Sequence, residues 1–222
     1  MRLLRGRADD HERDHERTRA MVAAVAADGD PALRVWRPHR QVAFGRRDRH
    51  GAGYERARRR ARSRGYAVLE RAVGGRAVAY TGRTVAVALA EPGGRDGIDA
   101  RYDRVTGAVR NALAAVGVQA SEGEPADSFC PGTHSLQADG KLVGLAQRVR
   151  QDVALTAGIV VVADHEALAA VLAPVYDALA VPFDPGSVGS VARAGGDPDG
   201  VLDALERELV GDRDVTGRDR VA

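Results

Sequence analysis

Two spacings of apolar residues alternate along the chain. Apolar positions that recur every three or four residues predict helices, over residues 8–27, 53–64, 99–116, 165–179 and 199–210, with an interruption at Pro174. Short apolar runs predict strands, over residues 33–36, 41–45, 66–71, 77–80, 84–90, 118–121, 135–138, 142–148 and 154–163. Asp139-Gly140 separates two of these strands and is typical of a hairpin turn. Because several strands follow one another without a helix between them, we predict an α+β fold with mixed β-sheets flanked by helices.

The length of 222 residues fits one compact domain. We expect residues 1–182 to form the main domain. Residues 183–222 are expected to form a Pro/Gly-rich connection, a last helix and a frayed tail that belong to the same domain.

Charge and apolar content limit the function classes. The formal net charge is only +2, so the chain is not a nucleic-acid-binding polycation. No apolar run reaches the length of a membrane span, and the first 30 residues contain no signal-peptide core. We therefore expect a cytoplasmic protein without nucleic-acid or membrane partners.

The helix over residues 53–64 has a dense basic face. This face could dock an acidic partner, or it could be an ordinary solvated helix surface. Its basic residues are Arg56, Arg58, Arg59, Arg60, Arg62 and Arg64.

Three features carry candidate chemistry. Cys130 is the only cysteine and begins a Pro-Gly turn, and Lys141 is the only lysine and follows the predicted hairpin turn. Gly74-Gly75 lies between two predicted strands, where the backbone could approach a ligand or simply turn. Taken singly, the cysteine could be an inert small apolar residue and the lysine a solvent-facing one. A reactive thiol would require a nearby positive charge or base.

Histidines offer a weaker signal. His134 follows Cys130 by four residues and is an alternative base. The six histidines are scattered, without the spacing of metal ligands, so we predict no metal site.

Two motifs together resemble the lipoate-protein ligase A and octanoyltransferase superfamily, whose fold is that of the biotin/lipoate-protein ligase catalytic domain. The resemblance covers roughly residues 14–210. It rests on Arg71, Gly74, Gly75, Ala77 and Val78, followed by Gly140, Lys141, Gly144, Ala146 and Gln147.

The segment from Phe129 to Gly132 resembles the lipoyl/octanoyl amidotransferase branch, in which a cysteine before the lysine hairpin accepts the acyl group. Arg76 stands where the ligases have a third glycine, and Tyr80 where they have a histidine. Both departures argue against the ATP-dependent reaction, because that loop wraps the acyl-adenylate. The ligases also usually have an accessory domain, which this chain is expected to lack.

The resemblance implies an acyltransferase that moves a lipoyl or octanoyl group to a carrier lysine through a thioester. Cys130 would be the nucleophile, and Lys141 would favour its thiolate or donate to the carbonyl oxygen, aided by backbone N–H groups near Gly144 and Leu145. The implied substrate-binding residues are Arg71, Gly74, Gly75, Ala77, Gly144 and Ala146.

The implied partners are lipoyl-domain carriers, namely the glycine cleavage H protein and the acyltransferase subunits of 2-oxoacid dehydrogenases. No cofactor is implied. Two alternatives stay open: an ATP-dependent lipoate ligase that uses an acyl-adenylate, and a non-catalytic regulator that binds the carrier or the acyl group.

Overall fold

Two β-sheets organise the chain in the computed structural model, which describes residues 1–71, 75–93 and 97–221. The larger sheet has eight strands in the order β11-β1-β2-β6-β10-β9-β8-β7, and the smaller has the order β4-β3-β5. The strands of the larger sheet are β1 (Arg2–Gly6), β2 (Ala32–Trp36), β6 (Val85–Pro92), β7 (Ser121–Glu122), β8 (Ser135–Gln137), β9 (Lys141–Val149), β10 (Val153–Val160) and β11 (Gly217–Val221). Those of the smaller sheet are β3 (Gln41–Phe44), β4 (Ala67–Glu70) and β5 (Val78–Tyr80). Both sheets mix parallel and antiparallel pairs, as the α+β prediction requires.

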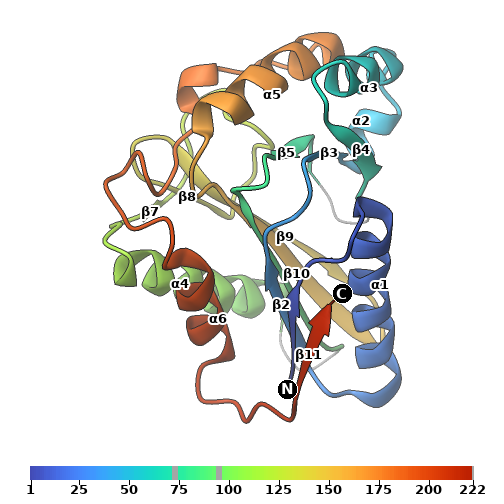
Figure 1. The fold of residues 1–222 in the computed structure, drawn as a ribbon, viewed down its shortest axis with the longest axis vertical. Helices are drawn as coiled ribbons and strands as arrows, with labels where there is room; N and C mark the ends of the chain where they lie inside the picture. Colours follow the sequence, from blue (N-terminus) through green and yellow to red (C-terminus); the bar gives the residue numbers. More distant parts are fainter. Residues whose placement is uncertain (72–74, 94–96, 222) are drawn as a thin grey trace.

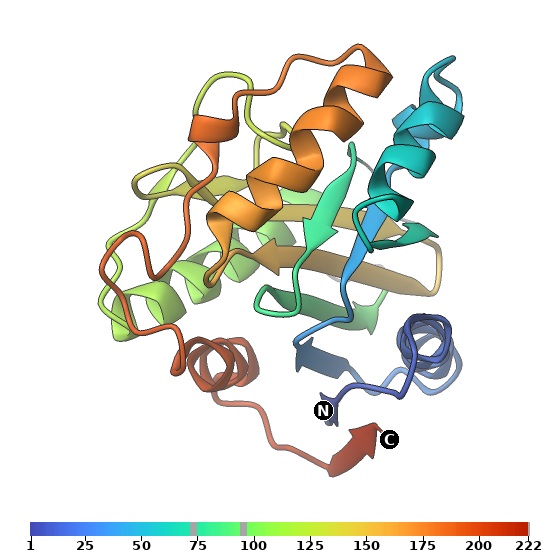
Figure 2. The same cartoon turned by 45° about the horizontal axis from the view of Figure 1, so that its top comes forward.

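Helices cover both faces of the larger sheet (Figures 1 and 2). The helices are α1 (His11–Asp28), α2 (Arg46–Arg49), α3 (Tyr54–Arg62), α4 (Ile98–Ala115), α5 (His165–Leu179) and α6 (Val201–Val210). Helices α4 and α6 enclose the main apolar core on one face, whereas α1 packs on the other face through Met21 and Val25. A separate core joins α3 and α5 to the smaller sheet. No helix in the described ranges is both long and apolar enough to cross a bilayer.

The start of α1 is fixed by a buried ion pair. The Asp10 side chain accepts a hydrogen bond from the Arg13 backbone N–H (2.8 Å) and so caps the helix. One turn into the helix, the carboxylate of Asp14 pairs with the buried guanidinium of Arg34 on β2 and accepts a hydrogen bond from Trp36 Nε1 (2.9 Å). These contacts hold α1 against the sheet.

The two ends of the chain depart most from the prediction. The tail is not frayed, since β11 pairs in parallel with β1, a strand that the sequence did not predict. Both strands are short, and β11 is mostly polar, so neither has the apolar alternation that marks a strand. Their pairing joins opposite ends of the chain, which no local pattern reveals.

Two other predictions were wrong. Helix α5 continues through Pro174, because Val171, Leu172 and Val175 around it are buried in the core and offset the lost backbone hydrogen bond. Of the predicted strand over residues 118–121, only Ser121 lies in a strand, at the start of β7. Val118 is buried there without belonging to a strand.

Candidate active site

Cys130 lies on the loop between β7 and β8 in a left-handed conformation, with a φ of 44°. A residue other than glycine pays a conformational cost there, so its surroundings must hold it. The Tyr176 hydroxyl on α5 accepts a hydrogen bond from the Cys130 backbone N–H (2.6 Å) and donates one to the Ala77 carbonyl (2.9 Å). The sequence did not single out Tyr176, which lies 46 residues beyond the cysteine.

Two N–H groups donate to the sulfur of Cys130. Arg71 Nη2 lies 2.9 Å from Sγ, and the Arg76 backbone N–H donates at 3.3 Å. The same Arg71 nitrogen also donates to the Arg76 carbonyl at 2.6 Å. A guanidinium and a backbone amide therefore both donate to the sulfur, and the guanidinium contact brings a positive charge to it.

The charge of Arg71 is retained despite its burial. Burial alone would lower the pKa of Arg71, but the attraction of Cys130 and Tyr80 raises it above its ordinary value. The Cys130 sulfur therefore faces a permanent positive charge.

Lys141 supports the cysteine loop from beneath. Its side chain is 0% exposed, and its ammonium donates to the carbonyls of Phe129 and Cys130 (both 2.9 Å) and to Glu124 Oε2. An ammonium has three N–H donors, and these three acceptors use all of them. Lys141 was expected to contact the Cys130 sulfur, but its three donors are used elsewhere. Arg71 donates to the sulfur instead.

Glu124 connects the lysine to the rest of the loop. Its carboxylate also accepts hydrogen bonds from the Gly132 backbone N–H and from the Ser135 hydroxyl, both at 2.9 Å. Although burial alone would raise the pKa of Glu124, the hydrogen bond and the charge of Lys141 lower it below its ordinary value. Glu124 was not among the residues that the sequence singled out. The need of a buried lysine for a counter-ion was the signal that could have identified Glu124.

The glycine motif brings two backbones together. A Cβ on Gly75 would lie 2.5 Å from Cys130 Sγ, and one on Gly45 would lie 1.8 Å from the Gly75 carbonyl oxygen. Gly75 is therefore a close-approach glycine rather than a plain turn. Gly74 lies outside the described residues.

The side chain of Arg76 turns away from the sulfur. Its Nη1 lies 3.3 Å from Oδ1 of Asp48 on α2. Burial raises the pKa of Asp48, which is also held by the Gly45 N–H (3.0 Å). Arg76 thus links the glycine loop to α2.

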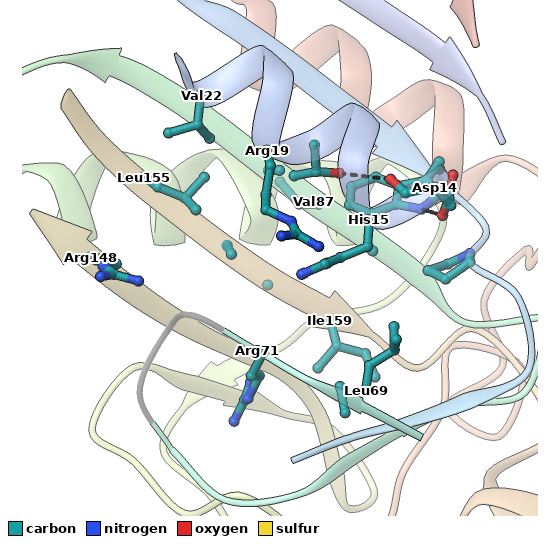
Figure 3. Close-up of a pocket in the computed structure, with 18 of the residues that line it drawn as sticks. Asp14, His15, Arg19, Val22, Leu69, Arg71, Val87, Arg148, Leu155 and Ile159 are labelled. Atoms are coloured by element: carbon teal, nitrogen blue, oxygen red, sulfur yellow. Dashed lines mark hydrogen bonds between the residues drawn. The ribbon is translucent and has the colours of Figure 1, made fainter. Parts of the chain in front are cut away.

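Cys130 opens onto a chamber of about 190 Å³. A larger cleft of about 330 Å³ adjoins it, and the two share Arg71, Gly144 and Ile159 as lining residues. In Figure 3, Arg19 and Val22 project from α1 over the strand that carries Leu155 and Ile159. The cleft is thus a channel between α1 and the sheet that leads toward the sulfur.

Small side chains create the floor of this channel. Ala88, Ala157 and Ala146 are direct neighbours across β6, β10 and β9. The first two line the cleft and the third lines the chamber. Larger residues at these positions would occupy the space.

The other predicted residues have different places. Gly144 lines both cavities, whereas the Ala77 side chain is fully buried in the core shared by α3 and α5. The Leu145 N–H donates to the His134 carbonyl (2.9 Å), so it is not free to bind an oxyanion.

Arginines surround the openings. Arg47 lines the chamber, and Arg19, Arg148 and Arg150 line the cleft. Burial, together with repulsion from Arg150 and Arg46, lowers the pKa of Arg148. We call Arg19, Arg46, Arg47, Arg148 and Arg150 the arginine rim.

Helix α3, which carries the predicted basic face, packs against α5 (Figure 2). Arg56 donates to the Ala178 carbonyl (2.8 Å) and Arg58 to Glu55 (2.8 Å). Within the described residues, no cluster of three or more potential metal ligands occurs.

A family model described as the lipoyl protein ligase A/B catalytic domain matches residues 12–191. The chain belongs to this family. The superfamily indicated by the two sequence motifs is therefore confirmed. The match includes Arg71, Cys130 and Lys141, so the site lies within the family's catalytic domain.

A curated relative is the octanoyl-[GcvH]:protein N-octanoyltransferase of Geobacillus kaustophilus, which is 30% identical over 141 residues. The alignment covers 61% of this chain and 50% of the relative, so the chain spans about half the length of that protein.

Solved structures of the family have the same fold. A lipoate-protein ligase A bound with ATP superposes with a TM-score of 0.77 at 21% identity, covering 100% of this chain and 89% of the other. A putative lipoate protein ligase of Thermoplasma acidophilum with bound lipoic acid has a TM-score of 0.72 at 22% identity, with the same coverage. At this identity, the likeness establishes the fold alone.

Proposed function

We propose that this protein transfers an octanoyl or lipoyl group to a lysine of a lipoyl-domain carrier through a thioester on Cys130. The observation that carries the proposal is the Cys130 thiol itself. Its sulfur accepts two N–H donors, one of them from a guanidinium, and faces a chamber continuous with an elongated cleft. The octanoyltransferase relative supports the same reaction class.

The reaction divides into two acyl transfers. The Cys130 thiolate attacks the acyl carbonyl of the donor, a C–S bond forms, and the donor's leaving group departs with its electron pair and a proton. The amine of the acceptor lysine then attacks the thioester, an amide bond forms, and the thiolate is released. Arg71 and the Arg76 N–H stabilise the thiolate before the first step and after the second.

The larger cleft would hold the acyl chain. Its lining combines Val22 of α1 with Leu69 of β4 and with Leu155 and Ile159 of β10. An aliphatic chain placed there removes apolar surface from water on both sides, which favours binding. The acyl carbonyl would then lie at the junction with the chamber, beside Arg71.

The carrier would approach from the arginine rim. Because the acceptor lysine must reach the Cys130 sulfur, the carrier surface around that lysine has to lie against the chamber opening. Arg47 lines that opening, and Arg46 is exposed beside it on α2. The proposed carriers are the glycine cleavage H protein and the acyltransferase subunits of 2-oxoacid dehydrogenases, and acidic residues around the acceptor lysine would complement this charge.

Intact-mass analysis tests the proposal directly. The protein is mixed with octanoyl- or lipoyl-loaded carrier, and we expect a hydroxylamine-sensitive acyl adduct that maps to Cys130. Cys130→Ala should lose both the adduct and the transfer to a second carrier. Transfer at the wild-type rate by Cys130→Ala would sink the proposal.

Two controls separate the alternatives. The proposed reaction uses no cofactor, so transfer should proceed without ATP. Pyrophosphate release from ATP and free lipoate, undiminished in Cys130→Ala, would identify an ATP-dependent ligase instead. Tight carrier binding without turnover from any donor would identify a regulator.

A further inference from the structure

His134 borders the same chamber as Cys130 and is held there on two sides. Its ring stacks on Tyr102 of α4, with the ring centroids 3.4 Å apart and the planes 7° from parallel. Its backbone carbonyl accepts the Leu145 N–H at 2.9 Å. The Tyr102 hydroxyl in turn accepts the Gln147 N–H at 2.8 Å. The imidazole therefore has a defined orientation beside the chamber.

Acyl transfer between lysines needs a group that moves protons. An amine attacks only in its neutral form and sheds a proton as the amide forms, and the reverse reaction must return that proton to the departing amine. A group that performs both tasks has to change its protonation state near neutral pH and has to face the reacting atoms.

The other ionisable groups that line the chamber, among the described residues, do not meet this requirement. Arg47 and Arg71 keep their protons. Burial raises the pKa of Tyr102. Cys130 carries the acyl group during the second step. Imidazole is the side chain that ordinarily exchanges a proton in this pH range, which leaves His134.

The two charged groups beneath the chamber are already committed. Lys141 donates its three N–H groups to Glu124 and to the carbonyls of Phe129 and Cys130. The Glu124 carboxylate accepts hydrogen bonds from Lys141, Ser135 and Gly132. By contrast, neither ring nitrogen of His134 has a hydrogen-bond partner among the described residues. Its proton-accepting nitrogen is therefore available to a substrate.

We propose that His134 is the proton acceptor for the attacking carrier lysine, and the proton donor to the departing lysine when the acyl donor is an amide. This assignment rests on the proposed thioester function. In the second step, the N–C bond forms, the proton of the amine moves to the imidazole, the C–S bond breaks, and the electron pair stays on Cys130 Sγ. Tyr102 is a positioning residue, because it acts through the ring of His134.

The nature of the leaving group provides a sharp test. An amide donor expels an amine, which must be protonated as it leaves. A thioester donor expels a thiolate, which needs no proton. Loss of His134 should therefore slow loading of Cys130 from an octanoyl-lysine carrier, but not loading from an octanoyl aryl thioester.

The experiment uses the full chain, loads Cys130 with the octanoyl aryl thioester, and follows a single turnover onto apo carrier by intact mass. We expect His134→Gln and His134→Ala to load within about twofold of wild type and to transfer about 100- to 10,000-fold more slowly. Added imidazole should restore part of the transfer rate in His134→Ala. His50→Gln, at an exposed histidine outside both cavities, is the matched control and should behave like wild type.

Variants of Tyr102 test the positioning role. Tyr102→Leu removes the stacked ring and should slow transfer at least tenfold without slowing loading from the thioester, and Tyr102→Phe, which keeps the ring, should be slowed less.

Each outcome separates this inference from the proposed function. Transfer at the wild-type rate by both His134 variants overturns the inference alone. Equal loss of thioester loading and transfer also overturns it, because it would assign His134 a structural role. Failure of the wild-type protein to form any Cys130 thioester overturns the proposed function instead.

Discussion

Arg71 Nη2 donates a hydrogen bond of 2.9 Å to Cys130 Sγ across a separation of 59 residues. A contact between a guanidinium and a thiolate contributes about 1.5–3 kcal/mol, so its loss should slow the reactions of the sulfur about 10- to 100-fold. Arg71→Gln should show this in the rate of alkylation by iodoacetamide at pH 7, measured by mass spectrometry. Arg47→Gln removes an equal charge from the same chamber and should change the rate less than threefold. Similar rates for both variants would contradict the specific contact.

Gly75→Ala tests the close approach of the glycine loop. The new Cβ would lie 2.5 Å from both Cys130 Sγ and Arg71 Nη2, so the contact between these groups must break. Gly82→Ala is a matched control, because Gly82 has nearly the same φ (92° against 93°) and nothing within 4 Å. Both variants should lose about 1–2 kcal/mol of stability through backbone strain. Only Gly75→Ala should lose transfer activity, and an active Gly75→Ala protein would refute the packing argument.

The alanine floor predicts the acyl chain length. Ala157→Leu adds three carbons between Ala88 and Ala146 and should shorten the channel. We expect the variant to load a butyryl group from an aryl thioester at nearly the wild-type rate and an octanoyl group at least tenfold more slowly. Competition between the two donors, read by intact mass, measures the ratio. An unchanged ratio would place the acyl chain elsewhere.

Acid should weaken the support of the cysteine loop. The folded-state pKa of Glu124 is lowered, chiefly because Lys141 overcomes the effect of burial. The stabilisation is therefore fully present above the ordinary glutamate value of 4.5 and is lost as the pH falls through the lowered pKa. Glu124→Gln should lose about 2 kcal/mol at pH 7, and less at pH 3.5, in urea unfolding. Equal losses at the two pH values would disprove the assignment.

The arginine rim predicts a salt-dependent KM for the carrier. Arg46→Glu should raise this KM about tenfold at low ionic strength and much less at 0.5 M salt, because salt screens exposed charges. Arg60→Glu makes the same change on α3 and should leave KM unaltered, because Arg60 lines neither the chamber nor the cleft, whereas Arg46 adjoins Arg47, which lines the chamber. A larger effect of Arg60→Glu would favour α3 as the docking surface, which the sequence left undecided.

The sequence predicts the elements that have local signals. The predicted hairpin at Asp139-Gly140 is present, because the turn residues and the flanking apolar runs both favour it. Strands β6 and β10 were predicted because they are largely buried and their sequences are therefore nearly continuous apolar runs. The pairing of β11 with β1 lacked any such signal, since it depends on contacts between opposite ends of the chain.

The candidate site likewise contains residues that the sequence could identify and contacts that it could not. Gly75 lies against the Cys130 sulfur, whereas Lys141 contacts the Cys130 backbone carbonyl. The hydrogen-bond partners of Cys130 and Lys141 could not be read from spacing. Arg71 and Tyr176 reach the cysteine from other parts of the chain, and Glu124 turns back onto Lys141 from within the cysteine loop itself. A side chain such as Lys141 has several acceptors within reach, and only the folded backbone decides which of them it binds.

The chamber and the cleft share Arg71, Gly144 and Ile159 but otherwise have different walls. Under the proposed function, substitutions on the floor of β6 and β10 would alter which acyl chain is accepted, while changes on α2 and the surrounding surface would alter which carrier is received. Such a division allows the two substrate preferences to evolve independently around an unchanged sulfur.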